Sequence, residues 1–173
     1  TTTGPSAEID HTLIEVTSLD KELTPHERVE IPIDRSSIEM PRTLKYAGKG
    51  IAHIKAGGVS FWLVDTARSS HRNGSEVRLL DETYDPVQEH GFVAIEPEKS
   101  ITVGRLHTTL PFLLPTTVSR EHFRVMHDGD NLIVENLNPS NATRVSTQIR
   151  AQEKPRVWVD ADRTVVVQDR LRG

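Results

Sequence analysis

VGRLHTTLPFLLPTTVSREHFRVMHDGDNLIVENLNPSNAT, residues 103–143, places three short polar clusters among strand-like runs. The clusters are Gly104-Arg105, Ser119-Arg120-Glu121-His122 and Ser140-Asn141-Ala142-Thr143. Fourteen positions separate Arg105 from Ser119, and twenty-two separate Ser119 from Asn141. The runs between them are short and rich in β-branched residues, and residues 127–131 carry the composition of a hairpin turn. This segment therefore predicts short strands joined by polar loops.

The rest of the chain continues this pattern and shows almost no helical period. Gly57-Gly58 is expected to close a hairpin within residues 44–67, whereas residues 19–28, 36–43 and 81–90 are expected to be loops or linkers. Short strands at this spacing predict an all-β fold, a two-sheet antiparallel β-sandwich. The other expected strands are 11–16, 29–34, 77–80, 92–95, 101–106, 122–126, 132–135, 143–145, 157–159 and 164–167.

The composition narrows the classes of protein that the chain can belong to. With 173 residues, it is long enough for one domain, or for one domain with an extension. The formal net charge of -4 argues against non-specific nucleic-acid binding, which needs a basic surface. The absence of cysteine excludes disulfides, thiol catalysis and thiolate zinc sites. No nucleic-acid partner is expected.

The domain organisation is predicted from the same pattern. Residues 1–45 are expected to form an N-terminal extension that is partly disordered or adds strands, and residues 46–173 to form the sandwich, with a motif core at 92–167. The extension either packs beside the sandwich or acts as a separate docking segment. No apolar run approaches the roughly 20 residues that cross a bilayer, so we expect no membrane contact in this segment. The expected location is cytoplasmic, and a membrane anchor elsewhere in a longer parent stays open.

At their spacings, the three clusters resemble the signature of the forkhead-associated (FHA) domain family. That family has Gly-Arg at a strand end, Ser-Arg-x-His in the next loop and strand, and Asn-Gly-Thr further along. The matching segments here are residues 101–105, 118–123 and 136–143. Residues 157–167 resemble the closing strand–turn–strand of the family. Earlier strands are then needed to complete the two sheets.

The resemblance implies a sandwich whose loops bind phosphothreonine peptides at one end. Arg105 would contact the phosphate or hold the binding loop, Ser119 would donate its hydroxyl to a phosphate oxygen, and Arg120 would add a second cation. Ser140 would help to bind the phosphate and recognise the threonine methyl, and Asn141 would hydrogen-bond the peptide backbone. The implied partner is a phosphothreonine-containing protein, either the substrate of a Ser/Thr kinase or the kinase itself.

Three further residues would support this site rather than touch the ligand: Gly104, Thr143 and His122, which would tie the binding loops together. Simple electrostatics favours the same division of roles. A phosphate carries about -1.5 to -2 charges and three strong acceptors. Arginine provides planar, charge-assisted contacts, so a pair of arginines with a hydroxyl donor suits that group.

An alternative reading is an FHA-like structural interaction domain that has lost phosphate binding and contacts its partner independently of phosphorylation. Ala142, where the family has glycine, and the apolar loop Leu110–Leu114 favour this alternative. A third reading, a β-sandwich hydrolase, lacks a nucleophile–base pair in the sequence. The eight histidines form no metal-binding pair. We therefore expect no enzymatic activity, no cofactor and no metal site.

Overall fold

The computed structural model describes residues 15–67, 75–137, 139–151, 156–159 and 165–168. The expected strand at 11–16 lies mostly outside these ranges. The elements, in chain order, are β1 (Val16–Leu23), β2 (Arg28–Pro32), β3 (Ser36–Ser37), the 3-10 helix η1 (Arg42–Leu44), β4 (Lys49–Ala56), β5 (Val59–Ala67), β6 (Ser75–Asp85), β7 (His90–Ile95), β8 (Ser100–Val103), β9 (Phe123–His127), β10 (Asn131–Asn136), β11 (Thr143–Arg150), β12 (Arg156–Val159) and β13 (Val165–Gln168).

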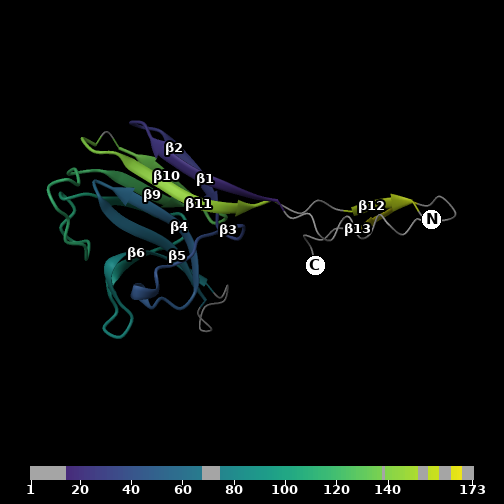
Figure 1. Ribbon diagram of the computed structural model, residues 1–173, viewed down its shortest axis with the longest axis horizontal. Helices are drawn as coiled ribbons and strands as arrows, with labels where there is room; N and C mark the ends of the chain where they lie inside the picture. The colour runs from purple at the N-terminus through teal and green to yellow at the C-terminus, as the bar shows by residue number, and fades with distance from the viewer. Residues whose placement is uncertain (1–14, 68–74, 138, 152–155, 160–164, 169–173) are drawn as a thin grey trace. The chain divides into compact units, whose positions relative to one another are not determined.

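Two antiparallel sheets form the sandwich, which confirms the predicted fold class. The larger sheet has the strand order β1-β11-β4-β5-β6-β7, with β3 also paired to β11, and the smaller has the order β2-β10-β9-β8. Figure 1 shows the two sheets as separate layers, with β2, β10 and β9 above β4, β5 and β6. Most strands of the larger sheet precede residues 103–143 in the chain. β11, which follows these residues, joins that sheet by pairing with β4.

The core lies between the two layers. In β9 and β10 every second residue is buried, as the period of two in a strand requires when one face is covered. A second apolar cluster lies on the other face of the larger sheet, where Leu44 of η1 packs with Trp62, Val64 and Leu80. The predicted Gly57-Gly58 turn joins β4 to β5, and both glycines have the positive φ that such a turn needs.

The expectation of a loop at residues 19–28 is wrong for its first half, because β1 continues to Leu23. The segment is rich in charged residues, a composition that is more typical of a solvent-exposed loop than of a strand. In the structure β1 is the terminal strand of the larger sheet, where most of its side chains stay exposed. Asp20 forms an ion pair with Arg144 of β11 at 2.7 Å, so charge is compatible with pairing here.

Residues 81–90 also differ from the expected loop, because β6 continues to Asp85. The register with β7 shifts between Leu80 and Asp85, so the strand carries an irregularity that its sequence pattern does not show. Asp81 stabilises this stretch by accepting hydrogen bonds from the N–H and the hydroxyl of Thr83, at 3.0 and 2.6 Å. The expected linker at 36–43 contains β3 and the start of η1.

The chain divides into two compact units. One unit comprises residues 18–149, and the other comprises residues 1–17 and 150–173. The first unit includes β2 and β3 of the expected N-terminal extension. The second unit contains β12 and β13, which pair with each other in a sheet of their own rather than extending the sandwich.

We predict that residues 15–151 fold without the remainder of the chain. All buried members of both apolar clusters lie between Leu23 and Val145, so the shortened chain keeps the whole described core. Thermal unfolding followed by circular dichroism should remain cooperative, with a midpoint within about 5 °C of that of the full chain. A shortened chain that unfolds without a cooperative transition would contradict this prediction.

Candidate functional site

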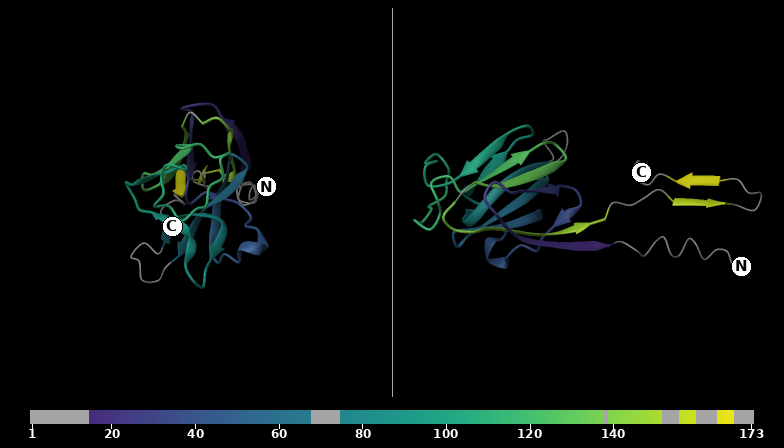
Figure 2. Two further views of the ribbon diagram at one scale, coloured as in Figure 1. Left: turned by 90° about the vertical axis from the view of Figure 1, so that its left-hand side faces the viewer. Right: turned by 90° about the horizontal axis from the view of Figure 1, so that it is seen from above.

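Two connections lie at the same end of the sandwich, the left-hand end in Figure 1. They are the β8–β9 connection, residues 104–122, and the β10–β11 connection, residues 137–142, in which Asn138 is not among the described residues. The left panel of Figure 2 views the molecule from this end. These connections, with Thr143 at the start of β11, carry every residue that the sequence analysis assigned to the site.

Gly104 allows the two ends of the β8–β9 connection to touch. A Cβ atom at this position would lie 1.9 Å from the carbonyl oxygen of Arg120, a contact that no side chain tolerates. The N–H of Arg105 donates to the carbonyl of Ser119, and the N–H of Leu106 to that of Arg120, both at 3.1 Å. The close approach of the two backbones therefore places Arg105 beside Ser119.

The side chain of Arg105 is fixed by its own loop. Its Nε donates to the carbonyl of Val118 at 2.6 Å. Among the described residues no partner is seen for the terminal nitrogens of Arg105, and the residue is exposed. An arginine held through Nε presents its two terminal nitrogens together, which is the arrangement that bidentate binding of an anion uses.

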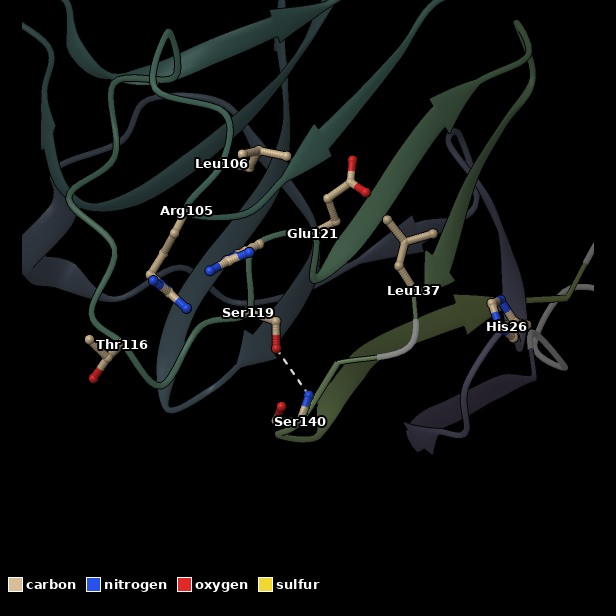
Figure 3. Close-up of a pocket in the computed structure, with 9 residues that line it drawn as sticks. His26, Arg105, Leu106, Thr116, Ser119, Glu121, Leu137 and Ser140 are labelled. Atoms are coloured by element: carbon tan, nitrogen blue, oxygen red, sulfur yellow. Dashed lines mark hydrogen bonds between the residues drawn. The ribbon is translucent and has the colours of Figure 1, made fainter.

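The hydroxyl of Ser119 joins the two connections. Its Oγ accepts a hydrogen bond from the backbone N–H of Ser140 at 3.0 Å. Figure 3 shows this bond, with Ser119 lying between Arg105 and Ser140. Because the oxygen acts as an acceptor, the hydroxyl proton remains available for donation to a ligand. Ser119 is thus held in place and keeps one free donor.

His122 lies fully buried beneath the site, where it connects the same two segments. Its Nδ1 accepts from the backbone N–H of Ser119 at 3.0 Å, and its Nε2 lies 3.4 Å from the carbonyl oxygen of Ala142. These partners require a neutral ring with the proton on Nε2. Burial lowers the pKa of His122, against the smaller opposing effect of the nearby carbonyl groups, so the neutral form is favoured.

The side chain of Asn141 makes a contact within the protein, and its expected role with a peptide backbone stays a prediction. Its Nδ2 donates to the carbonyl of Thr117 at 2.7 Å, which is a contact between the two connections. The residue is exposed but does not line the pocket described below. Ala142 does not have a positive φ, so the backbone there does not require the glycine found in the FHA family.

Thr143 and Asn136 brace the site from below. The buried hydroxyl of Thr143 donates to Oδ1 of Asn136 at 2.7 Å, and Nδ2 of Asn136 donates to the carbonyl of Leu23 at 2.9 Å. The backbone of Asn136 accepts from the N–H of His26 at 2.7 Å and donates to the carbonyl of Glu27 at 2.9 Å. The turn between β1 and β2 is therefore fastened to the end of β10.

An open pocket of about 650 Å³ lies over these groups. Its charged side chains are two arginines and one glutamate, and that glutamate, Glu121, is directed to Nε2 of His107 at 3.2 Å. No ion pair or side-chain hydrogen bond of Arg120 is seen among the described residues, so its charge is not compensated there. The pocket is lined by His26, Arg105, Leu106, Thr116, Ser119, Arg120, Glu121, Leu137 and Ser140 (Figure 3).

Several residues at the site were not expected from the sequence. His26 lines the pocket from the β1–β2 turn with a positive φ of 67°, and in Figure 3 it lies beyond Leu137 from Ser119. Gly57, in the β4–β5 turn, lies against the backbone of the β8–β9 connection. A Cβ atom at Gly57 would lie 2.2 Å from the carbonyl oxygen of Thr117, so this close approach requires glycine. Both positions depend on pairings between distant strands, and the local sequence gives no signal for either.

Comparison with known proteins finds no match to this chain among protein-family models, curated proteins or solved structures. Within the part of the chain that the structure describes, no three His, Asp or Glu side chains are grouped in a way that would hold a metal ion. The same part of the chain contains no helix with the length and apolar character needed to cross a membrane.

We predict that Gly104→Ala destabilises the protein by about 3 kcal/mol or more, because the added Cβ separates Gly104 from Arg120 and breaks the adjoining backbone hydrogen bonds. Gly58→Ala is the matched control, since its Cβ meets nothing within 4 Å and the substitution costs only the left-handed backbone, about 1–2 kcal/mol. Urea unfolding measures both changes. Equal losses for the two variants would contradict the close approach.

We also predict that the free energy of unfolding falls as the pH is lowered from about 7.5 to about 5.5. Burial holds the pKa of His53, His122 and His127 below the ordinary value. In this pH range the unfolded chain therefore binds more protons than the folded one. The stability that the three neutral rings contribute is fully present above pH ~6.5, and it is lost as the pH falls toward their lowered pKa in the folded state. Each histidine contributes at most about 1.4 kcal/mol per pH unit, and urea unfolding across the range measures the sum.

The contribution of His122 to this pH dependence can be measured separately. NMR titration should show that its ring stays neutral below the pH at which an exposed imidazole is half protonated. His122→Gln removes the titrating ring, so the variant should depend less steeply on pH than the parent protein, whatever its absolute stability. A slope equal to that of the parent would show that His122 does not couple protonation to folding.

Proposed function

We propose that the chain is a phosphothreonine-peptide-binding module of the FHA type, which mediates phosphorylation-dependent protein–protein interaction in Ser/Thr kinase signalling. The observation that carries the proposal is one pocket containing a fixed arginine, a second uncompensated arginine and a serine hydroxyl with a free proton. A phosphate monoester needs those donors. The preference for phosphothreonine over other phosphorylated residues rests on the resemblance of the three clusters to the FHA signature.

The electrostatics of the pocket supports an anionic ligand. The whole chain carries a formal charge of -4, so its long-range field does not attract phosphate. Locally, Arg105 and Arg120 line one pocket, and the carboxylate of Glu121 is engaged by His107. Binding thus depends on short-range, oriented contacts, which is how arginine clusters capture phosphorylated motifs.

The backbone of the β10–β11 connection supports phosphate binding over the alternative in which it has been lost. That alternative drew on Ala142 and on the apolar loop. Ala142 causes no backbone strain, because its φ is not positive, and its carbonyl accepts from the N–H of Gly57 at 3.3 Å. One of the two reasons for the alternative is thereby removed. The other, the apolar loop, does not compete with the arginines for their pocket.

We predict that Arg105→Ala or Ser119→Ala weakens binding of a phosphothreonine peptide ten- to a hundred-fold, since each removes a donor to a charged group worth about 1.5–3 kcal/mol. Isothermal titration calorimetry with a phosphothreonine peptide, selected from a library, measures the change. Arg144→Ala and Ser146→Ala are the matched controls, because both residues contact Asp20 on β1 and do not line the pocket.

Arg105→Lys tests the geometry rather than the charge. The three N–H groups of lysine diverge from one nitrogen. Lysine therefore cannot reproduce the parallel pair of donors that two guanidinium nitrogens present to a phosphate while the third nitrogen holds the carbonyl of Val118. Its affinity should therefore lie between those of the parent protein and the alanine variant. The unphosphorylated peptide is the remaining control: equal affinity for both forms of the peptide would support the phosphorylation-independent alternative and overturn this proposal.

A further inference from the structure

Of the described residues that line the candidate pocket, one is acidic, and its carboxylate is not directed at the arginines. This residue is Glu121, and Figure 3 shows its carboxylate pointing away from Ser119 and from Arg105. The carboxylate lies 3.2 Å from Nε2 of His107. The side chain of Glu121 is 56% exposed, and among the described residues no other partner of its carboxylate is seen, so packing does not fix its direction. The contact with His107 therefore decides where this negative charge lies.

His107 is placed by the tight turn that follows β8. The N–H of His107 donates to the carbonyl of Gly104 at 3.1 Å, which closes a four-residue turn. The N–H of Leu106, inside this turn, donates to the carbonyl of Arg120 at 3.1 Å, so the turn lies across the segment that carries the acidic residue. One turn thus presents Arg105 to the pocket and His107 to the carboxylate.

A carboxylate competes with a phosphate for the same partners, because arginine binds either group through paired, charge-assisted hydrogen bonds. Glu121 follows Arg120 directly in the chain, and both side chains line the pocket. The two residues precede β9, so the alternation that separates neighbouring side chains in a strand does not apply to them. Released from His107, the carboxylate of Glu121 would compete with a ligand phosphate for the arginines.

We propose that His107 is a positioning residue for anion binding: it holds the carboxylate of Glu121 out of the pocket, and without it this carboxylate pairs with an arginine and closes the pocket to phosphate. The inference rests on the proposed function, since it concerns the affinity of the same pocket for a phosphorylated peptide. Both competing contacts lie at the surface, where an ion pair changes an equilibrium constant by roughly 1.4- to fivefold. Because the contacts are similar in strength, one histidine shifts the balance.

A double-mutant cycle tests this role. Isothermal titration calorimetry with one phosphothreonine peptide compares the parent protein, His107→Ala, Glu121→Gln and the double variant. We expect His107→Ala to weaken binding about threefold, and Glu121→Gln to bind at least as tightly as the parent protein. In the Glu121→Gln variant, the further change His107→Ala should alter the affinity by less than about 1.5-fold, because the amide that replaces the carboxylate carries no charge.

His107→Gln separates the positioning of the carboxylate from the support of the loop. Its amide nitrogen can replace Nε2 as the donor to the carboxylate, so it should restore most of the affinity that His107→Ala loses. Glu30→Gln is the matched control for charge, because Glu30 is exposed on β2 and does not line the pocket, and it should bind as the parent protein does. Equal losses for His107→Ala with and without Glu121→Gln would show that His107 only supports the loop, and would overturn the inference.

The same measurements separate this inference from the proposed function. A parent protein that binds phosphorylated and unphosphorylated peptides equally would refute the proposed function, and the inference with it. If the parent protein prefers the phosphorylated peptide but Glu121→Gln lowers its affinity, the inference alone is overturned, because Glu121 then assists the ligand rather than competing with it.

Discussion

The neutral imidazole of His122 is the contact on which the candidate site depends. It is buried beneath the β8–β9 connection, accepts from Ser119 and faces the carbonyl of Ala142 in the other connection. Neither a protonated ring nor an apolar side chain of similar size could make both contacts. The two connections would then lose one of the contacts that join them, and Ser119 would lose the hydrogen bond that holds its backbone. A residue with no exposed atom thus controls the geometry of exposed ones.

Around His122 the sandwich supplies support from segments that are distant in sequence. Asn136 ties the β1–β2 turn to the end of β10, and Gly57 in the β4–β5 turn lies against Thr117. The pocket is therefore built by the folded sandwich as a whole, although its charged groups come from one continuous stretch. A substitution at Gly57 would reach the pocket through backbone contacts, whereas His26 of the β1–β2 turn lines the pocket itself.

The fold class was predictable because the chain carries the period of two and the turn residues of a β protein over most of its length. Residues 19–23 of β1 were predicted as a loop, because a charged terminal strand has the same composition as a charged loop. The site clusters were predictable as a group, since they lie in the connections on either side of the β9–β10 hairpin. The orientation of Asn141 toward Thr117 and the approach of Gly57 to the same residue were not, because both arise from register between strands far apart in sequence.

The hydrogen bond from Arg105 Nε to Val118 has a consequence for the entropy of binding. Ordering a flexible side chain at an interface costs about 0.5–1.5 kcal/mol, and Arg105 has already met that cost in the unbound protein. Arg120, for which no side-chain partner is seen among the described residues, has not. In the proposed phosphate binding the two arginines would therefore contribute differently: Arg105 would act as a rigid group, whereas Arg120 would lose motional freedom on binding. An anion at this pocket would meet one fixed cation and one that closes on it.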